Sequence, residues 1–99
     1  MYAIVRDNLY DSAKLAQGGD QLAEFQALHA RQPGYRGTIV VDAGNGRWLA
    51  VNLWETAEHA EAARQALLPE VRRLLEPLMA RPSQLIATGP VVLADLTPP

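Results

Sequence analysis

Cysteine is absent from this 99-residue sequence, so the chain can form no disulfide, thiolate nucleophile or zinc–thiolate site. Long apolar runs are absent too, since none approaches the roughly 18 residues that a membrane span requires. The first residues lack the basic and then apolar pattern of a signal peptide. Charge is nearly balanced, with 9 Lys and Arg against 11 Asp and Glu and a net charge of −2. We therefore expect a soluble, cytoplasmic protein that binds neither nucleic acid nor a membrane.

The sequence also has no motif for binding a phosphate, a metal ion or a cofactor. Gly44-Asn45-Gly46 is not followed by Lys-Ser or Lys-Thr, so it predicts a hairpin turn instead of a phosphate-binding loop. His29 and His59 are the only histidines, and they lie far apart without a carboxylate at metal-ligand spacing. We expect no bound metal ion and no cofactor.

Enough apolar residues are present for one core. They make up 48% of the 99 residues, which predicts a single domain over residues 1–99. An apolar strand that begins almost at residue 1 is what we expect of a complete domain. Apolar, β-branched runs predict strands at residues 1–6, 37–42, 47–54 and 84–96. Apolar residues at helical spacing predict helices over residues 20–32, 56–66 and 69–81.

Turn and helix-cap residues mark where these predicted strands and helices begin and end. Asp7-Asn8 closes the first predicted strand, and Asp20 caps the first helix, leaving residues 11–19 unassigned. Thr56 caps the second helix, which Pro69 interrupts and restarts. The resulting order predicts an α+β, ferredoxin-like βαββαβ fold, with a four-stranded, mainly antiparallel sheet and both helices on one face.

Both faces of the predicted sheet are apolar or aromatic, although the helices cover only one. In the third strand one face carries Leu49, Val51 and Leu53, and the other carries Trp48, Ala50, Asn52 and Trp54. We expect a second copy of the chain to cover the remaining face in a homodimer. Gly89-Pro90 is expected to turn the apolar residues 91–96 out of their own sheet and onto the partner.

Several short motifs resemble those of the antibiotic biosynthesis monooxygenase (ABM) family of dimeric α/β barrels. They are Pro33-Gly34-Tyr35-Arg36-Gly37 after the first helix, and Asn52-Leu53-Trp54-Glu55-Thr56 leading into a helix with Glu58-His59. The resemblance extends over nearly the whole chain. It implies homodimers whose sheets pack face to face. Members include cofactor-free monooxygenases of polycyclic aromatic polyketides, quinol oxygenases, haem-degrading oxygenases and proteins without a known activity.

The match to the haem-degrading branch is confined to one position. Asn8 stands where that branch has its functional asparagine, whereas its functional Trp and His fall at Ala63 and near Arg73. Because neither residue supplies an indole or an imidazole, we expect no haem chemistry. Asn52 and Trp54 resemble an Asn–Trp pair of the polyketide branch, at a different spacing.

Four residues are candidates for catalysis: Asn52, Trp54, His29 and His59. An amide inside an apolar strand is unfavourable unless it has a partner. For Asn52 that partner would be a ligand or, equally, a group at the dimer interface or on a helix. Trp54 would stack on a flat substrate, or fill a core. The histidines would move protons near neutral pH, or play structural roles.

Four further residues are candidates for substrate binding: Asn8, Tyr35, Arg36 and Trp48. Asn8 would orient a carbonyl or hydroxyl group, or simply end its strand. Tyr35 and Arg36 would line the mouth of a pocket, or belong to a surface turn. Trp48 would wall the site beside Trp54, or pack in the core.

Together with these candidate residues, the resemblance to the ABM family implies a small cofactor-independent monooxygenase that acts on a hydroxylated aromatic molecule, polyketide-like or quinol-like. The alternative is a non-catalytic homodimer of the same fold that binds a small molecule or a protein. A roomy pocket with Asn52 pointing into it would favour the enzyme. A collapsed core with Asn52 bonded to backbone would favour the binding protein.

Overall fold

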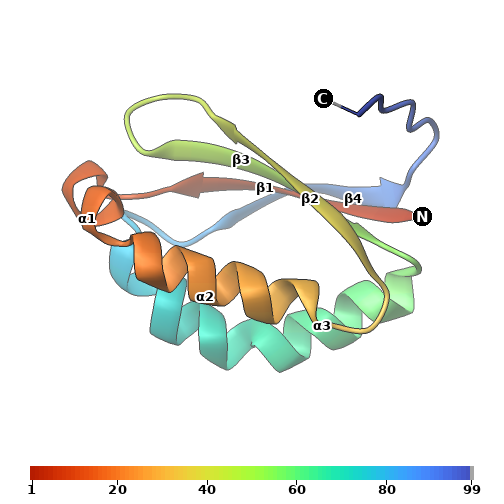
Figure 1. Cartoon of the computed structure of the whole chain (residues 1–99), viewed down its shortest axis with the longest axis horizontal. Helices are drawn as coiled ribbons and strands as arrows, with labels where there is room; N and C mark the ends of the chain where they lie inside the picture. Colours follow the sequence, from red (N-terminus) through yellow and green to blue (C-terminus); the bar gives the residue numbers. More distant parts are fainter. Residues whose placement is uncertain (99) are drawn as a thin grey trace.

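The computed structural model describes residues 1–98 and has two layers, a four-stranded antiparallel sheet and a layer of helices beneath it (Figure 1). The strands are β1 (Tyr2–Leu9), β2 (Tyr35–Asp42), β3 (Arg47–Trp54) and β4 (Gln84–Pro90). Their order is β2-β3-β1-β4, with every pair antiparallel. The predicted α+β, ferredoxin-like fold is confirmed.

The helical layer consists of two long helices, one short helix and two helical turns. A short helix, α1 (Ser12–Gln17), precedes α2 (Gly19–Ala30), and α3 (Ala57–Glu70) follows the hairpin. A π-helical turn, η1 (Val71–Leu75), and a 3₁₀ turn, η2 (Glu76–Leu78), lead from α3 toward β4. Helices α2 and α3 lie side by side under one face of the sheet, as Figure 1 shows.

Local cap chemistry explains where the helices begin. The Asp11 carboxylate accepts hydrogen bonds from the backbone N–H groups of Ala13 and Lys14, so α1 forms in the stretch left unassigned above. The predicted cap at Asp20 is wrong, because α2 already begins at Gly19. Thr56 caps α3 as predicted, its hydroxyl accepting from the His59 N–H.

Two predicted boundaries also move. Asp7-Asn8 does not end the first strand, since β1 continues to Leu9 in register with β3. Pro69 does not interrupt the second helix, because it lies inside α3. Proline removes one backbone donor from a helix, and the π turn η1 follows directly after α3.

The hairpin lies where the sequence predicts it, with β3 over the predicted residues and β2 starting at Tyr35. Asn45 and both flanking glycines have positive φ, the conformation that Asn and Gly adopt most readily in tight turns. A side chain at Gly46 would collide with the Tyr10 backbone oxygen, so the turn packs closely on the end of β1.

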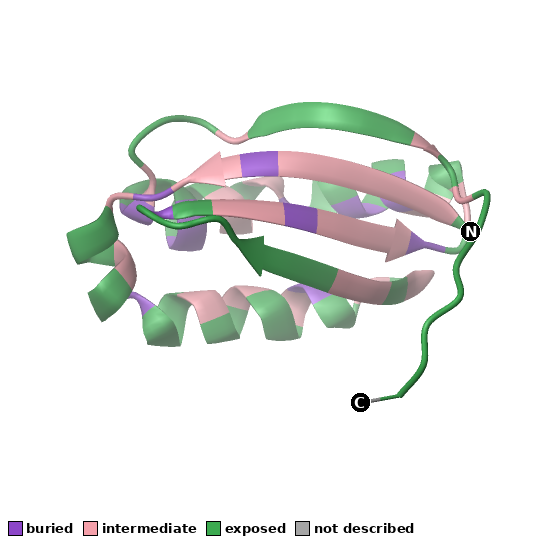
Figure 2. Cartoon of the chain, turned by 90° about the horizontal axis from the view of Figure 1, so that it is seen from above, coloured by how far each residue is buried: buried purple, intermediate pink, exposed green. Residues whose placement is uncertain are grey.

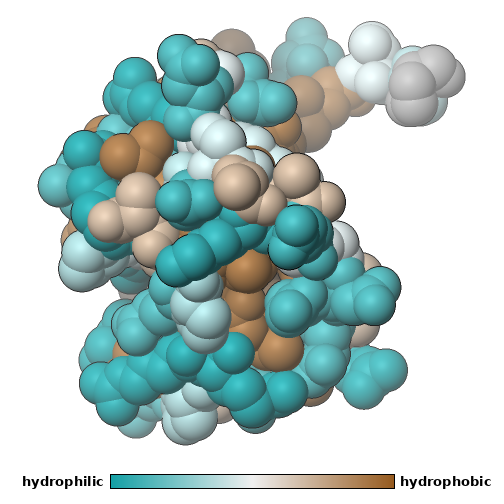
Figure 3. All heavy atoms as spheres, turned by 90° about the vertical axis from the view of Figure 1, so that its left-hand side faces the viewer, coloured by the Kyte–Doolittle hydropathy of each residue, from teal (hydrophilic) through white to brown (hydrophobic). Residues whose placement is uncertain are grey.

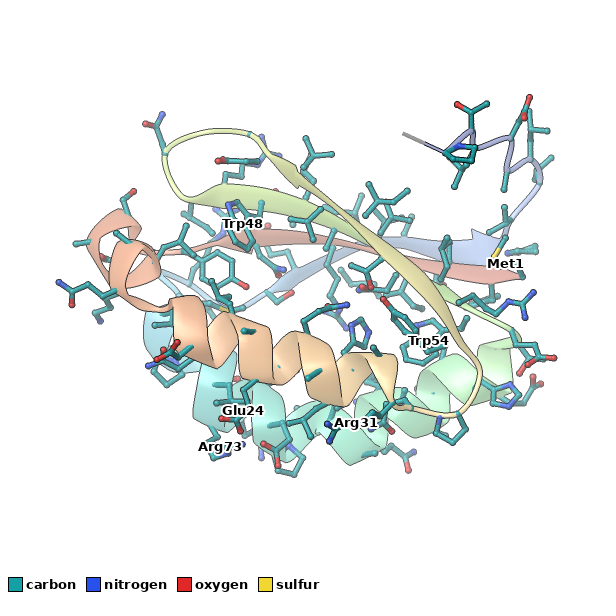
Figure 4. All side chains as sticks on the ribbon, in the orientation of Figure 1. Met1, Glu24, Arg31, Trp48, Trp54 and Arg73 are labelled. Atoms are coloured by element: carbon teal, nitrogen blue, oxygen red, sulfur yellow. The ribbon has the colours of Figure 1, made fainter. Side chains whose placement is uncertain are left out.

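The core lies between the sheet and the helices. Trp54 of β3 is 3% exposed and packs with Ala60, Ala63 and Leu67 of α3. The two tryptophans therefore lie on the helix side of the sheet, toward opposite ends of β3 (Figure 4). The predicted division of β3 into two faces is confirmed, since its even-numbered residues line the space beneath the sheet.

The opposite face of the sheet carries no helix, and Figure 2 looks onto it from above. Its edge residues Ile39 and Val41 are 43% and 52% exposed. β4 ends at Pro90, and Val92 and Leu93 beyond it are 96% and 83% exposed. The strand therefore ends at the predicted Gly89-Pro90 break, and the strand region predicted to reach residue 96 does not continue beyond it. Within residues 1–98 no helix is both long enough and apolar enough to cross a membrane.

Candidate functional site

A cleft of about 1010 Å³ runs between the sheet and the helices. This volume lies at the upper end of the range of small-molecule sites. Its roof is the helix-facing side of β1 and β3, and its floor comes from α2, α3 and η1. Figure 3 looks at one end of the molecule, where apolar atoms show between polar side chains at its middle. The lining includes Asn8, His29, Trp48, Asn52 and Trp54, five of the eight candidate residues.

Asn52 is held by a chain of side-chain hydrogen bonds. The Gln26 amide donates to the Tyr35 hydroxyl (3.1 Å), which donates to the Thr38 hydroxyl (2.9 Å). Thr38 in turn donates to Asn52 Oδ1 (3.2 Å). Thr38 reaches Asn52 because the two residues are direct partners in the β2–β3 register.

This chain determines which end of the Asn52 amide is free for a ligand. Its oxygen is occupied by Thr38, whereas its nitrogen has no hydrogen-bond partner among the described side chains. The amide therefore presents N–H donors to the cleft. Hydrogen bonds in a chain polarise one another, which strengthens each donor in turn.

Asn8 and Trp48 lie opposite each other in the β1–β3 register, at the other end of the cleft. Asn8 Oδ1 and Trp48 Nε1 are both buried without a hydrogen-bond partner among the described residues. The indole packs with the Tyr10 ring in a T-shaped arrangement, with ring centroids 5.3 Å apart at an interplanar angle of 67°. An unpaired buried acceptor and an unpaired buried donor on directly paired residues are an unfavourable arrangement in a folded protein.

His29 of α2 is buried in an aromatic cluster. Its ring centroid lies 5.3 Å from that of Trp54, 5.2 Å from that of Tyr35 and 5.6 Å from that of Phe25. Burial disfavours the charged imidazolium and lowers the pKa of His29 from 6.5 to about 4. The side chain is therefore neutral at neutral pH, and the same burial makes its free nitrogen a weaker proton acceptor than that of an exposed histidine.

The other three candidates lie outside the cleft lining. His59 sits at the start of α3, where its Nδ1 lies 2.7 Å from the Thr56 hydroxyl and its ring packs against Gly34. Arg36 is exposed on β2. Tyr35 does not line the cleft, but its hydroxyl is connected to it by the hydrogen bonds through Thr38 to Asn52.

The structure also brings residues into the cleft that the sequence reasoning missed. Arg6 lies in the middle of β1 on the helix-facing side, between Asn8 and Ile4. The sequence could have indicated Arg6, because it is the only charged residue on the face of the first strand that also carries Ile4. Thr38 and Tyr10 carried no comparable signal, since both look like ordinary strand or turn residues.

The cleft has no cluster of metal ligands. Across residues 1–98, no three His, Asp or Glu side chains lie close enough together to hold an ion. The ion pairs near the helices are surface features, such as Arg73 with Glu24 and Glu70 on the outer side (Figure 4). The chemistry available to the cleft is therefore that of its amide, indole, imidazole, guanidinium, hydroxyl and carboxylate side chains.

Comparison with known proteins finds a likeness in structure alone. No protein-family model matches the sequence, and no curated protein matches it significantly. Among solved structures, a Bordetella bronchiseptica protein assigned as an antibiotic biosynthesis monooxygenase superposes with a TM-score of 0.75 and 24% identity, covering 93% of this chain and 97% of its own. A Nitrosomonas europaea protein with the same assignment has a TM-score of 0.75 and 16% identity, over 94% of this chain and all of its own.

A third similar structure is a mutant of SnoaB, a cofactor-independent oxygenase from Streptomyces nogalater. It has a TM-score of 0.70 and 19% identity, and covers 92% of this chain and 95% of its own. At such identities the likeness is one of fold. The chain therefore has the fold of the antibiotic biosynthesis monooxygenase proteins over nearly its whole length.

Proposed function

We propose that the protein is a cofactor-independent monooxygenase that binds a hydroxylated aromatic molecule in the cleft. One observation carries the proposal: the cleft wall holds hydrogen-bonding groups that the protein itself does not use. They are the Asn52 amide nitrogen, Asn8 Oδ1 and Trp48 Nε1, among the described residues. The rest of the wall is largely apolar or aromatic, which suits a flat ligand.

The Asn8–Trp48 pair suits a ligand hydroxyl group. A hydroxyl donates its hydrogen to the carboxamide oxygen and accepts the indole N–H, so it satisfies both buried atoms at once. Each unpaired buried group costs about 1–3 kcal/mol, and the ligand recovers part of that energy. The two atoms are shielded in the free protein, so binding requires the indole to turn. That turn breaks no hydrogen bond of Trp48 Nε1.

Asn52 suits the oxygen on which charge develops. Removing a proton from a phenol or an enolisable ketone leaves an oxyanion, which N–H donors fixed in a partly dry site stabilise strongly. The hydrogen-bond chain through Thr38 holds the amide with its nitrogen available for this contact. His29 would accept the proton once the bound oxyanion offsets the cost that burial places on the imidazolium.

The deprotonated substrate would supply all the electrons that the reaction needs. It transfers one electron to O₂, and the two radicals combine to form a carbon–oxygen bond in a hydroperoxide. Loss of water then breaks the O–O bond and leaves a carbonyl group. One oxygen atom ends in the product and the other in water, so a CH₂ group and O₂ give C=O and H₂O.

Two observations favour this enzyme over a non-catalytic binding protein. The cleft is roomy, at about 1010 Å³, and Asn52 lines it. Its oxygen is bonded to the Thr38 side chain, and no backbone hydrogen bond holds its amide within residues 1–98. The fold likeness to SnoaB, a cofactor-independent oxygenase, is consistent with the proposal.

Oxygen consumption tests the proposal. The protein is assayed with a panel of anthrones, naphthols and quinols, and we expect at least one to consume O₂ above its spontaneous rate. Asn52→Ala should lower the rate about 10²-fold, the usual cost of losing an oxyanion donor. Trp48→Phe keeps the ring but removes the N–H, and should weaken binding by about tenfold. Arg36→Gln, outside the cleft, is the matched control. Tight binding without O₂ consumption would instead support the binding protein.

We further propose that the working unit is a homodimer built through the uncovered sheet face. That face includes Val5, Leu49 and Val51 at its centre and the exposed Ile39 and Val41 at its edge. A second copy packing sheet to sheet would remove this apolar surface from water.

The exposed C-terminal segment 91–96 would add to the same interface. Its residue Leu96 is 71% exposed, and the segment extends from the edge strand β4 beyond the sheet (Figure 2). Apolar side chains at such exposure favour a partner surface. Light scattering should therefore give a mass near twice 10.8 kDa.

A further inference from the structure

Arg6 stands out among the cations of the chain. It occupies the centre of β1, paired with Ala50 on one side and Leu85 on the other, and its side chain is half-buried in the cleft. Its single side-chain hydrogen bond, from Nη1 to the Ser83 hydroxyl, is long at 3.5 Å. No carboxylate within the described residues forms an ion pair with it.

The other charges around the cleft do not neutralise Arg6. Glu61 is held by Arg64 through two hydrogen bonds of 3.0 and 2.7 Å. Glu76, on η2, lies beyond ion-pair distance from Arg6. Burial, and then the like charge of Arg64, both lower the pKa of Arg6. An arginine has five donors and a planar fork that fits a carboxylate, yet here nearly all of that capacity is unused.

The backbone also changes at this residue. The β1–β4 register shifts between Val5 and Arg6, so that Ile86 of β4 is the extra residue opposite them. Such bulges twist a strand locally and re-aim the side chains beside them. The irregularity therefore falls at the one unpaired charge of the cleft roof.

The register fixes where Arg6 lies relative to the two polar ends of the cleft. On the helix-facing side the rows run Ile4–Asn52, Arg6–Ala50 and Asn8–Trp48. Successive rows are two residues apart, or about 7 Å along the strand. The Arg6 side chain therefore leaves the strand midway between the Asn52 and Asn8–Trp48 rows, and its guanidinium reaches toward Ser83, just before β4.

We propose that Arg6 is an anion-binding residue and that the ligand of the cleft is an aromatic carboxylate, whose carboxylate pairs with the guanidinium. The proposal rests on the proposed function for the aromatic part of the ligand. The carboxylate part of the ligand is inferred from charge complementarity. A carboxylate would accept two N–H hydrogen bonds from the guanidinium and neutralise its positive charge. Asn52 would then contact a second oxygen on one side of the carboxylate and the Asn8–Trp48 pair a hydroxyl on the other.

Isothermal titration with three matched probes tests this assignment. They are 3-hydroxy-2-naphthoic acid, its methyl ester and 2-naphthol, which share the ring and hydroxyl, and of which only the acid is charged. The acid should bind at least about tenfold more tightly than the ester, as expected for a charge-assisted pair. Arg6→Gln should abolish that preference and leave ester binding unchanged within about twofold. Arg36→Gln, an exposed arginine outside the cleft, should keep the preference.

A second measurement follows the guanidinium directly. The Arg6 Nε–H resonance, identified by its loss in Arg6→Gln, should shift in a saturable manner with benzoate and much less with inorganic phosphate. Arg6→Gln removes only one long hydrogen bond, so its melting temperature should match or exceed the wild-type value. An unfolded variant would itself show that Arg6 is structural and overturn the assignment.

The outcomes separate this inference from the proposed function. Equal binding of acid and ester, unchanged by Arg6→Gln, would overturn the anion site and leave the aromatic cleft intact. No binding of any naphthalene probe, together with a saturable benzoate shift, would overturn the proposed function and keep the anion site. A phosphate response equal to that of benzoate would overturn the aromatic carboxylate. No response to either anion would overturn the site altogether.

Discussion

The buried His29 should make the stability of the protein depend on pH. Its pKa is lowered from 6.5 to about 4, because burial disfavours the imidazolium. Between these two pH values the unfolded chain binds a proton that the folded chain does not. Stability is therefore fully present above pH 6.5 and is lost as the pH falls toward 4. At 1.36 kcal/mol per pKa unit, the loss from this residue reaches about 3 kcal/mol.

The test compares the wild type with His29→Phe. Phenylalanine keeps a ring beside Phe25, Tyr35 and Trp54 but has no titratable group. Urea unfolding is followed by tryptophan fluorescence at a fixed protein concentration, from pH 4 to pH 7.5. The difference in unfolding free energy between the two proteins should change by about 3 kcal/mol across this range, in favour of the variant at low pH.

A matched control separates titration from packing. Leu67→Val also removes buried volume from the core but no titratable group, so its cost of about 1 kcal/mol should be the same at every pH. The carboxylates of Asp7 and Glu61, whose pKa values are lowered by arginine partners, titrate equally in all three proteins and cancel in the differences. Parallel curves for wild type and His29→Phe would refute the argument, because they would mean that His29 takes up its proton as readily folded as unfolded.

Three further outcomes follow from the same geometry. Asn52→Leu should lower the free energy of unfolding by no more than about 1 kcal/mol, since it loses one hydrogen bond from Thr38. A loss of about 2 kcal/mol or more in urea unfolding would mean that the amide stabilises the fold instead of binding a ligand. Purified protein should not bind haem tightly, and a Soret band that saturates at one haem per chain and disappears in His29→Phe would contradict this. Deletion of residues 91–99 should loosen the dimer, and Val41→Glu on the exposed sheet edge should give a monomer in light scattering; a wild type that stays monomeric at micromolar concentration would refute the interface.

The sequence by itself was enough to predict the fold class. Strand β3 alternates strictly, the Gly-Asn-Gly turn fits only a hairpin, and Thr56 is a clear helix cap, so local chemistry and periodicity agree there. Predictions from local residue preferences were wrong where strand pairing or core packing between distant segments opposed those preferences. Asp7-Asn8 has turn chemistry, but both residues pair with β3, and Asp7 also pairs with β4, so β1 stays extended through them. Pro69 stays within α3, where Leu67 packs into the core.

The site was only partly predictable, because a cleft depends on which residues of distant elements face each other. Alternation put Trp48, Asn52 and Trp54 on one strand face, and the sequence marked Asn52 as unusual there. Only the tertiary structure placed His29 against Trp54 and left His59 outside. The strand register, which pairs Thr38 with Asn52 and Asn8 with Trp48, decides which polar atoms are used and which remain free. No local pattern encodes that choice, since it arises from hydrogen bonding between segments far apart in the chain.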